Sequence, residues 1–170
     1  MALRPIKNCF DPVLRKQCEI VKNIDGELIN LSKDMIETTL AAPGIGLAAN
    51  QIGVPWRVFV VNMGVETDTD NLITLINPEI TAMEGSESGE EGCLSIPDVV
   101  VEVNRAIQIE IKAVDLNGKD IRYEASGLLA RALQHEMDHL NGILFWDSLG
   151  KIKRDILKRK FKKKLKEQEE

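Results

Sequence analysis

The only two histidines of the chain, His135 and His139, are four residues apart, and Glu136 directly follows the first of them. On a helix, side chains four residues apart point the same way, so two imidazoles can bind one metal ion. A glutamate beside the first ligand can act as a general base toward a water molecule at that ion. The spacing therefore predicts a metal site on a helix, with hydrolysis as its chemistry.

A site with two histidines needs a third protein ligand, and Cys93 is the best candidate. A thiolate is a strong metal ligand, and the neighbouring Gly92 allows a close backbone approach. Cys9 and Cys18 have no such context, and we interpret them as structural. The alternative is a closed structural zinc site with two cysteines and two histidines, in which Glu136 would have no role.

Small residues are concentrated in a third stretch, residues 44–51, which reads GIGLAANQ. Small residues let a peptide backbone approach the chain closely. The stretch ends at Gln51, whose amide N–H could stabilise a developing oxyanion. The other interpretation is a glycine-rich connection from a helix to a strand.

The elements that must position these residues follow from hydrophobic periodicity. Helical spacing of apolar residues predicts helices over residues 25–42, with Asp25 as the N-cap, and over residues 126–141, which contain the two histidines. Short β-rich runs predict strands at residues 58–63, 72–77, 99–103, 107–111 and 121–125. We therefore expect an α+β fold in which mostly antiparallel β-sheets pack around a central metal-binding helix, with an N-terminal and a C-terminal helix.

Length and composition limit the class of protein. A chain of 170 residues fits one domain, and a net charge of −5 excludes a globally basic nucleic-acid binder. No apolar run approaches the roughly 18–20 residues that span a bilayer, and the start lacks the apolar segment of a secretory signal. We expect a cytoplasmic protein with neither a membrane nor DNA as a partner.

The last twenty residues carry ten Lys/Arg against four Asp/Glu. We expect residues 1–150 to form a single catalytic domain and residues 151–170 a basic C-terminal helix of that same domain. Two interpretations of this helix are compatible: an apolar stripe docks it on the body, and its basic face binds RNA or an anionic surface. The stripe comprises Ile152, Ile156, Leu157, Phe161 and Leu165.

Three stretches together resemble the signature motifs of the peptide deformylase family. They are residues 44–51 (GIGLAANQ), 91–95 (EGCLS) and 134–139 (QHEMDH), in the order and with the spacing of that family. The resemblance extends over about residues 5–148. It implies a hydrolase that removes the N-formyl group from the N-terminal formylmethionine of newly made polypeptides and releases formate.

The resemblance also implies roles for individual residues. Cys93, His135 and His139 would hold one Fe(II) per chain, with zinc, nickel or cobalt as substitutes. Ligand chemistry alone would favour zinc. Glu136 would be the general base and acid, and Gln51 with the backbone N–H of Leu94 would form the oxyanion hole. The backbone at Ile45, Gly46 and Gly92 would bind the peptide, and the basic helix could contact the ribosome; Asp138 would orient or stabilise the site.

Helical geometry adds a hypothesis about the methionine side chain of the substrate. Leu128, Arg131 and Ala132 precede the first histidine by seven, four and three residues, so they lie near the metal face. Leu128 and Ala132 could form an apolar pocket with Ile45 opposite. Arg131 would contribute only its stem and keep its charge in solvent. The alternative is that Leu128 is an ordinary core residue.

Two other function classes share some of these features. A metalloendopeptidase would use the same HExxH motif with a downstream third ligand, but this chain has Phe145 where metzincins have their third histidine. A binding module would combine a structural zinc with the basic tail and bind RNA. The third ligand separates the first class from a deformylase, and the response to metal removal separates the second.

Overall fold

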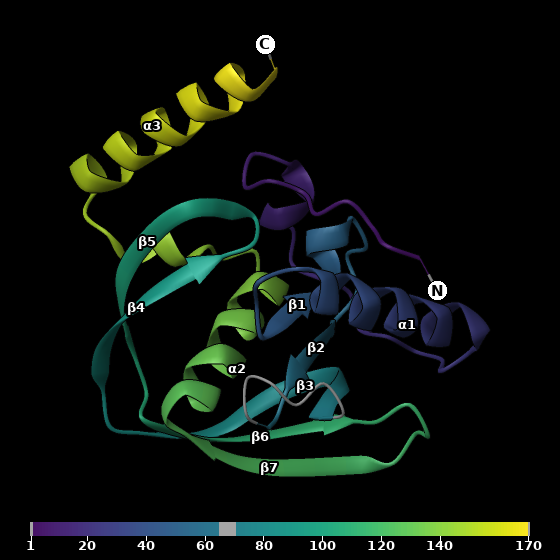
Figure 1. The fold of residues 1–170 in the computed structure, drawn as a ribbon. Coiled ribbons are helices and arrows are strands. Elements are labelled where there is room, and N and C mark those ends of the chain that lie inside the picture. The colour runs from purple at the N-terminus through teal and green to yellow at the C-terminus, as the bar shows by residue number, and fades with distance from the viewer. Residues whose placement is uncertain (1, 65–70, 170) are drawn as a thin grey trace.

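The computed structural model describes residues 2–64 and 71–169. The described residues form a mixed helix and strand fold, in which one helix passes through the middle (Figure 1). The helices are α1 (Gly26–Ala41), α2 (Gly127–Leu140) and α3 (Lys151–Glu169), and the strands are β1 (Gly46–Ala48), β2 (Val58–Asn62), β3 (Leu72–Glu84), β4 (Glu87–Cys93), β5 (Ile96–Arg105), β6 (Gln108–Val114) and β7 (Asp120–Ser126). Short 3₁₀ segments are η1 (Pro12–Arg15), η2 (Ala49–Ile52) and η4 (Phe145–Ser148).

Five strands form one sheet in the order β1-β2-β3-β6-β7, and each neighbouring pair is antiparallel. Strand β2 is buried over Val58–Val61, because Phe59 and Val61 lie in a core shared with α2 and Val58 and Val60 lie in a core shared with α1. The β6–β7 hairpin turns at Gly118, whose φ of 78° is a conformation that favours glycine. The short strand β1 lies at one edge of this sheet, beside the helix that carries the histidines.

The remaining two strands, β4 and β5, form a separate antiparallel hairpin. Cys93 pairs with Ile96 at its tip, and the register shifts between Glu91 and Cys93. This bulge changes the direction of the strand just before the cysteine. The hairpin therefore presents Cys93 toward the helix α2, which lies between the hairpin and the larger sheet (Figure 1).

Helix α2 is held on both sides because it has one apolar and one polar face. Leu133 and Leu140 are fully buried in the core that it shares with the five-stranded sheet. Gln134 exchanges two 2.9 Å hydrogen bonds with the backbone of Ala106, which lies between β5 and β6. Asn50 donates a 2.6 Å hydrogen bond to the carbonyl oxygen of His139 near the end of the helix. These contacts fix the helix that carries His135 and His139.

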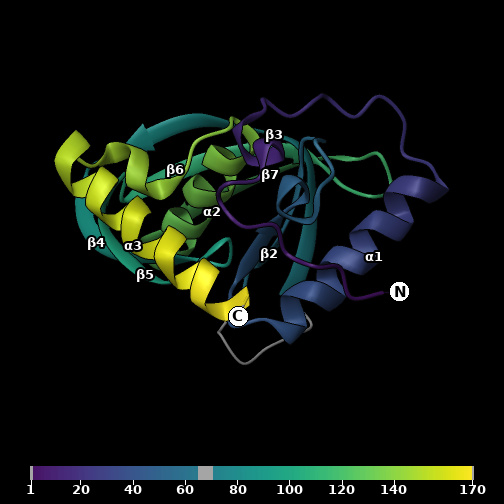
Figure 2. The ribbon, with the colours of Figure 1, turned by 90° about the horizontal axis from the view of Figure 1, so that it is seen from above.

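Helices α1 and α3 lie on opposite sides of the molecule (Figure 2). Helix α1 begins as expected after Asp25, whose side chain accepts a hydrogen bond from the backbone N–H of Leu28. Helix α3 docks through Phe161, which is 2% exposed, with Leu157 and Leu165 partly buried beside it. Ile152, at 78% exposed, and the exposed Ile156 lie outside this contact, so only part of the expected apolar stripe is used.

The predicted α+β class, with mostly antiparallel sheets around a central helix, is confirmed. Strands β1 and β4 were not predicted from the sequence. The three residues of β1 are too few to show a hydrophobic period, and β4, with the sequence ESGEEGC, is mostly exposed. Strand β3 extends to Glu84, beyond the predicted end at residue 77. In the described residues, no helix is both long enough and apolar enough to cross a membrane.

Candidate metal centre

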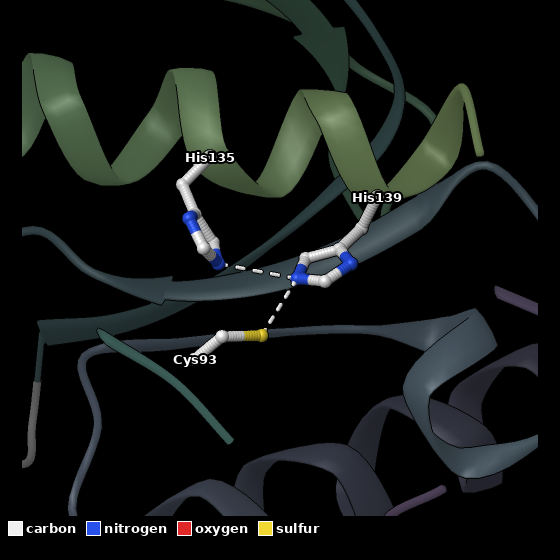
Figure 3. Close-up of side chains that lie close together, drawn as sticks. All are labelled: Cys93, His135 and His139. Atoms are coloured by element: carbon white, nitrogen blue, oxygen red, sulfur yellow. Dashed lines mark hydrogen bonds between the residues drawn. The ribbon is translucent and has the colours of Figure 1, made fainter. Parts of the chain in front are cut away.

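The two histidines of α2 and the cysteine of the β4–β5 hairpin meet at one point (Figure 3). Nε2 of His139 lies 3.1 Å from Nε2 of His135 and 3.3 Å from Sγ of Cys93, and one ligand atom from each of the three residues lies within 4.8 Å of the others. Two nitrogens and one sulfur are a donor set that suits a divalent transition metal. Within residues 2–64 and 71–169, this group of metal-ligating side chains contains neither Cys9 nor Cys18.

Glu91 orients the ring of His135, because Oε1 of Glu91 lies 2.9 Å from Nδ1 of His135, the ring nitrogen that points away from the triad. Glu91 also pairs with Arg105, at 2.8 and 2.9 Å, and with Arg131 at 2.8 Å. Burial alone would raise the pKa of Glu91, but the hydrogen bonds from Arg105 and His135 outweigh it and lower that pKa to about 2. Arg105 in turn bonds Asp138 of α2 at 2.5 Å. This network is typical of the outer shell that fixes metal-ligating histidines.

The two rings differ in their electrostatics. Burial lowers the pKa of His139 well below 6.5, so that ring is neutral and can bind a metal. Burial also opposes a charge on His135, but its hydrogen bonds with Cys93 and Glu91 raise its pKa to about 10. A metal at this point would therefore compete with a proton for His135.

Glu136 lies between the helix and the edge strand β1. Burial raises its pKa from 4.5 to about 7. A Cβ atom at Gly46 would lie only 2.9 Å from Oε1 of Glu136, so glycine is needed where β1 passes under the carboxylate. Within the part of the chain that the structure describes, Oε2 of Glu136 is buried without a hydrogen-bond partner. A buried, unpaired carboxylate beside a triad of metal-binding atoms fits a site that takes a metal and a water molecule.

Gln51 is fully buried and reaches the same point from η2. Its Oε1 accepts a 2.9 Å hydrogen bond from the backbone N–H of Ala48, which fixes the side-chain amide. Its Nε2 lies 3.1 Å from Oγ of Ser95 and 3.8 Å from Sγ of Cys93. Leu94 and Ser95 form the turn of the β4–β5 hairpin, next to the cysteine.

The triad opens into a cleft with a volume of about 700 Å³. One wall is the hairpin and its approach, including Gly92, Leu94 and residues 96–100, and the other is formed by residues 41–46. The face of α2 that borders the cleft carries Leu128, Arg131 and Ala132 together with His135 and Glu136. Every site residue expected from the sequence therefore borders this cleft except His139, which belongs to the triad but is buried.

Two expectations about the cleft need correction or completion. Leu128 is 60% exposed, so the alternative that it is an ordinary core residue is wrong. The charge of Arg131 is not in solvent: its side chain is 13% exposed and its guanidinium pairs with Glu91. A buried carboxylate that attracts the guanidinium explains the difference.

Sequence reasoning assigned no role to Glu91, Arg105 or Ser95. Glu91 lies two residues before the cysteine, and an acidic side chain so close to a metal ligand is the signal that could have identified it. Ser95 lies in the same short motif, two residues after the cysteine, whereas Arg105 gives no comparable signal because its partner Asp138 is distant in sequence.

Comparison with known proteins decides the family. The family model for polypeptide deformylase matches residues 3–155. The chain is 49% identical over 164 residues to a peptide deformylase from Thermodesulfovibrio yellowstonii, which covers 96% of this chain and 99% of that protein. This chain belongs to the peptide deformylase family.

Solved structures of peptide deformylases have the same fold. A crystal structure from Legionella pneumophila matches with a TM-score of 0.91 and 42% identity, covering 98% of both chains. A structure from Ehrlichia chaffeensis in complex with actinonin matches with a TM-score of 0.90 and 37% identity, covering 96% of this chain and 98% of that one. The resemblance seen in the three sequence motifs is thereby confirmed. The protein is a peptide deformylase-type metal-dependent hydrolase, which removes the N-formyl group from nascent peptides.

Proposed function

We propose that Cys93, His135 and His139 hold one divalent metal ion, and that this ion is Fe(II) in the cell. The convergence of three ligand atoms within 4.8 Å of one another is the observation that supports the site. The donor set alone also suits zinc, nickel and cobalt, so the choice of iron rests on the family resemblance and on metal availability in cells. When bound, the metal would supply a Lewis acid that polarises the formyl carbonyl and acidifies water.

Glu136 moves the protons of the reaction. Hydrolysis adds hydroxide to the formyl carbon and hydrogen to the peptide nitrogen. The carboxylate of Glu136 accepts a proton from water and returns it to the leaving amine as the C–N bond breaks and formate departs. A pKa of about 7 suits both directions of transfer near neutral pH.

The oxyanion that develops on the formyl oxygen is stabilised by N–H donors of this chain. Nε2 of Gln51 and the backbone N–H of Leu94 take this role in the proposal. The contact of Gln51 with Ala48 aims its amide before substrate arrives, so little reorganisation is needed. Its present partners, Ser95 and Cys93, lie on the hairpin side of the cleft, where the formyl group would enter.

The substrate peptide lies along the cleft in an extended conformation. The backbone at Ile45, Gly46 and Gly92 binds it, because the edge strand β1 and the hairpin offer backbone groups on both sides. The methionine side chain lies against Leu128 and Ala132, with Ile45 opposite.

The basic helix α3 brings the enzyme to the ribosome in the cytoplasm, where nascent chains emerge. Arg159, Lys160 and Lys163 are exposed, while Phe161 anchors the helix to the body. Reversing these three charges should weaken co-sedimentation with ribosomes and leave hydrolysis of a short formyl peptide intact. Unchanged co-sedimentation at low and high salt would reject this contact.

Formate release from a formyl-Met tripeptide tests the reaction itself. The protein is purified anaerobically, and the N-acetyl tripeptide is the control. Formate from the first peptide and no cleavage of the second is the expected result. Cleavage of internal peptide bonds without formate release would favour a metalloendopeptidase, and native protein that contains zinc and no iron would reject the choice of metal.

A further inference from the structure

Arg131 lies on the cleft face of α2, four residues before His135. Its side chain is 13% exposed, although arginine usually keeps its charge in solvent. The guanidinium turns from the cleft toward the β4–β5 hairpin, where it finds several acceptors at once.

These acceptors lie on both strands of the hairpin. Nη1 of Arg131 donates to Oε2 of Glu91 and to the carbonyl oxygen of Val103, each at 2.8 Å, and lies 3.5 Å from the carbonyl oxygen of Gly89. Nη2 donates to the carbonyl oxygen of Glu87 at 2.9 Å. One side chain of α2 therefore bonds β4 at three residues and β5 at one.

The hairpin is shaped to receive this guanidinium. A Cβ atom at Gly89 would lie 3.0 Å from the guanidinium carbon of Arg131, so a larger residue would press against it. Four residues after Gly89, at the end of the same strand, is Cys93. The position of the cysteine relative to the helix thus depends on how the hairpin is attached to α2.

We propose that Arg131 is a positioning residue: it clamps the β4–β5 hairpin to α2 and so fixes Cys93 relative to His135 and His139. Its aliphatic part at the same time forms the wall of the side-chain pocket between Leu128 and Ala132. The inference rests on the proposed function for the pocket, whereas the clamp itself can be tested without substrate.

Arg105 also binds the carboxylate of Glu91, but its other contacts differ from those of Arg131. It pairs with Glu91 and Asp138, and it does not border the cleft. Loss of Arg131 leaves Glu91 paired with Arg105, so the buried carboxylate keeps a counter-ion. The loss of Arg131 removes its hydrogen bonds to the backbone carbonyl groups of the hairpin. The effect of this clamp can therefore be separated from the effect of leaving Glu91 without a counter-ion.

Three substitutions divide the contributions of Arg131. Arg131→Met keeps the length and the apolar stem but removes every donor, Arg131→Lys keeps the charge and part of the donor set, and Arg131→Ala opens the pocket wall. Arg122→Met is the matched control, because Arg122 is exposed on β7 and pairs with Glu110 in the other sheet.

The first measurements use no substrate. Cobalt(II) affinity is measured through the thiolate absorption of the bound ion, and hydrogen exchange is measured at residues 87–91. Arg131→Met should lower cobalt affinity by about 10- to 100-fold, as is typical for loss of an outer-shell contact, and should speed exchange in β4. Arg131→Lys should lie between it and the parent, and Arg122→Met should match the parent in both.

The second measurement compares kcat/KM for formyl-Met and formyl-Phe tripeptides. Arg131→Ala should raise the relative rate on formyl-Phe, whereas Arg131→Met should leave the ratio near that of the parent because it keeps the wall. If the parent releases no formate, the proposed function fails, and the cobalt and exchange measurements still decide the clamp.

Gly89→Ala provides an independent test if the Arg131 variants fold poorly. It displaces the guanidinium without changing its chemistry and should reproduce part of the loss in cobalt affinity. Parental cobalt affinity and parental exchange in both Arg131→Met and Gly89→Ala would overturn the proposal.

Discussion

Glu91 lies 2.9 Å from Nδ1 of His135, and its charge determines which tautomer the ring adopts. Burial opposes ionisation of this carboxyl, but its hydrogen-bond donors lower its pKa to about 2, so it is ionised and can only accept hydrogen bonds near neutral pH. When His135 gives up one proton to bind a metal, the remaining proton is therefore held on Nδ1. Nε2 of the same ring faces Cys93 and His139, as a metal ligand must.

Replacing Glu91 with glutamine should weaken metal binding by about 10- to 100-fold. The amide removes the negative charge that Arg105 and Arg131 share, so Arg131 loses the carboxylate it pairs with, Arg105 keeps Asp138 alone, and the ring of His135 is less firmly oriented. Competition for zinc with a chromophoric chelator measures the affinity. The exposed Glu102 on β5 supplies the control substitution, and equal affinities for the two variants would contradict this role.

Replacing Glu136 with glutamine should preserve metal binding and remove most turnover. Loss of one general acid–base group lowers kcat by about 100- to 10,000-fold. The neutral amide keeps the shape of the side chain over Gly46 but cannot accept and return a proton. Formate release and metal content are measured on the same sample. Retained turnover at full metal content would remove Glu136 from the mechanism.

Replacing Glu136 with glutamine should also raise the free energy of unfolding of the metal-free protein. This gain should appear only as the pH rises above the unfolded pKa of 4.5. Because burial raises the pKa of Glu136 from 4.5 to about 7, ionisation penalises the folded state. The penalty is absent below the unfolded pKa, grows as pH rises and is complete above about pH 7, where the shift corresponds to about 3 kcal/mol. Urea unfolding of both metal-free proteins near pH 5 and pH 8 tests this. A stability difference that does not change with pH would count against it.

Among the three cysteines, only Cys93 should react readily with iodoacetamide. Burial raises the pKa of Cys9 to about 12 and that of Cys18 to about 11, so almost no thiolate is present at either residue near neutral pH. Mass spectrometry of the metal-free protein should show one modification per chain, at Cys93, and prior addition of zinc should prevent it. Labelling of Cys9 at a comparable rate would contradict the burial seen in the structure.

The helix of the metal site was predictable because its signals are local. The spacing of His135 and His139, the apolar stripe and the glycine after the helix lie within one short segment, and the predicted range 126–141 differs from α2 by one residue at each end. Asp25 likewise caps α1 as predicted. Thiolate chemistry and the neighbouring Gly92 made Cys93 the best candidate for the third ligand, and the family resemblance supported that choice, although Cys93 lies in the hairpin and meets α2 only through the fold.

The parts that sequence reasoning missed depend on distant contacts. Strand β4 has a polar, glycine-rich sequence that favours a loop, and only its pairing with β5 makes it a strand. The charge of Arg131 was expected in solvent, because nothing in a helix sequence shows that a carboxylate and three carbonyl groups lie within reach. Both misses involve the same hairpin, whose position is decided by tertiary structure.

The anchoring of α3 determines which experiments on the tail can be interpreted. The ring of Phe161 lies 6.4 Å from that of Trp146, and the adjacent Phe145 lies 6.1 Å from the ring of His135. The composition of α3 suggests a basic segment that could be removed without effect on the body. These aromatic contacts instead connect α3 to the ring of the metal ligand His135. Deleting the helix would therefore remove the proposed ribosome contact and disturb the metal site at the same time. Substitutions of exposed residues on the helix change the ribosome contact alone.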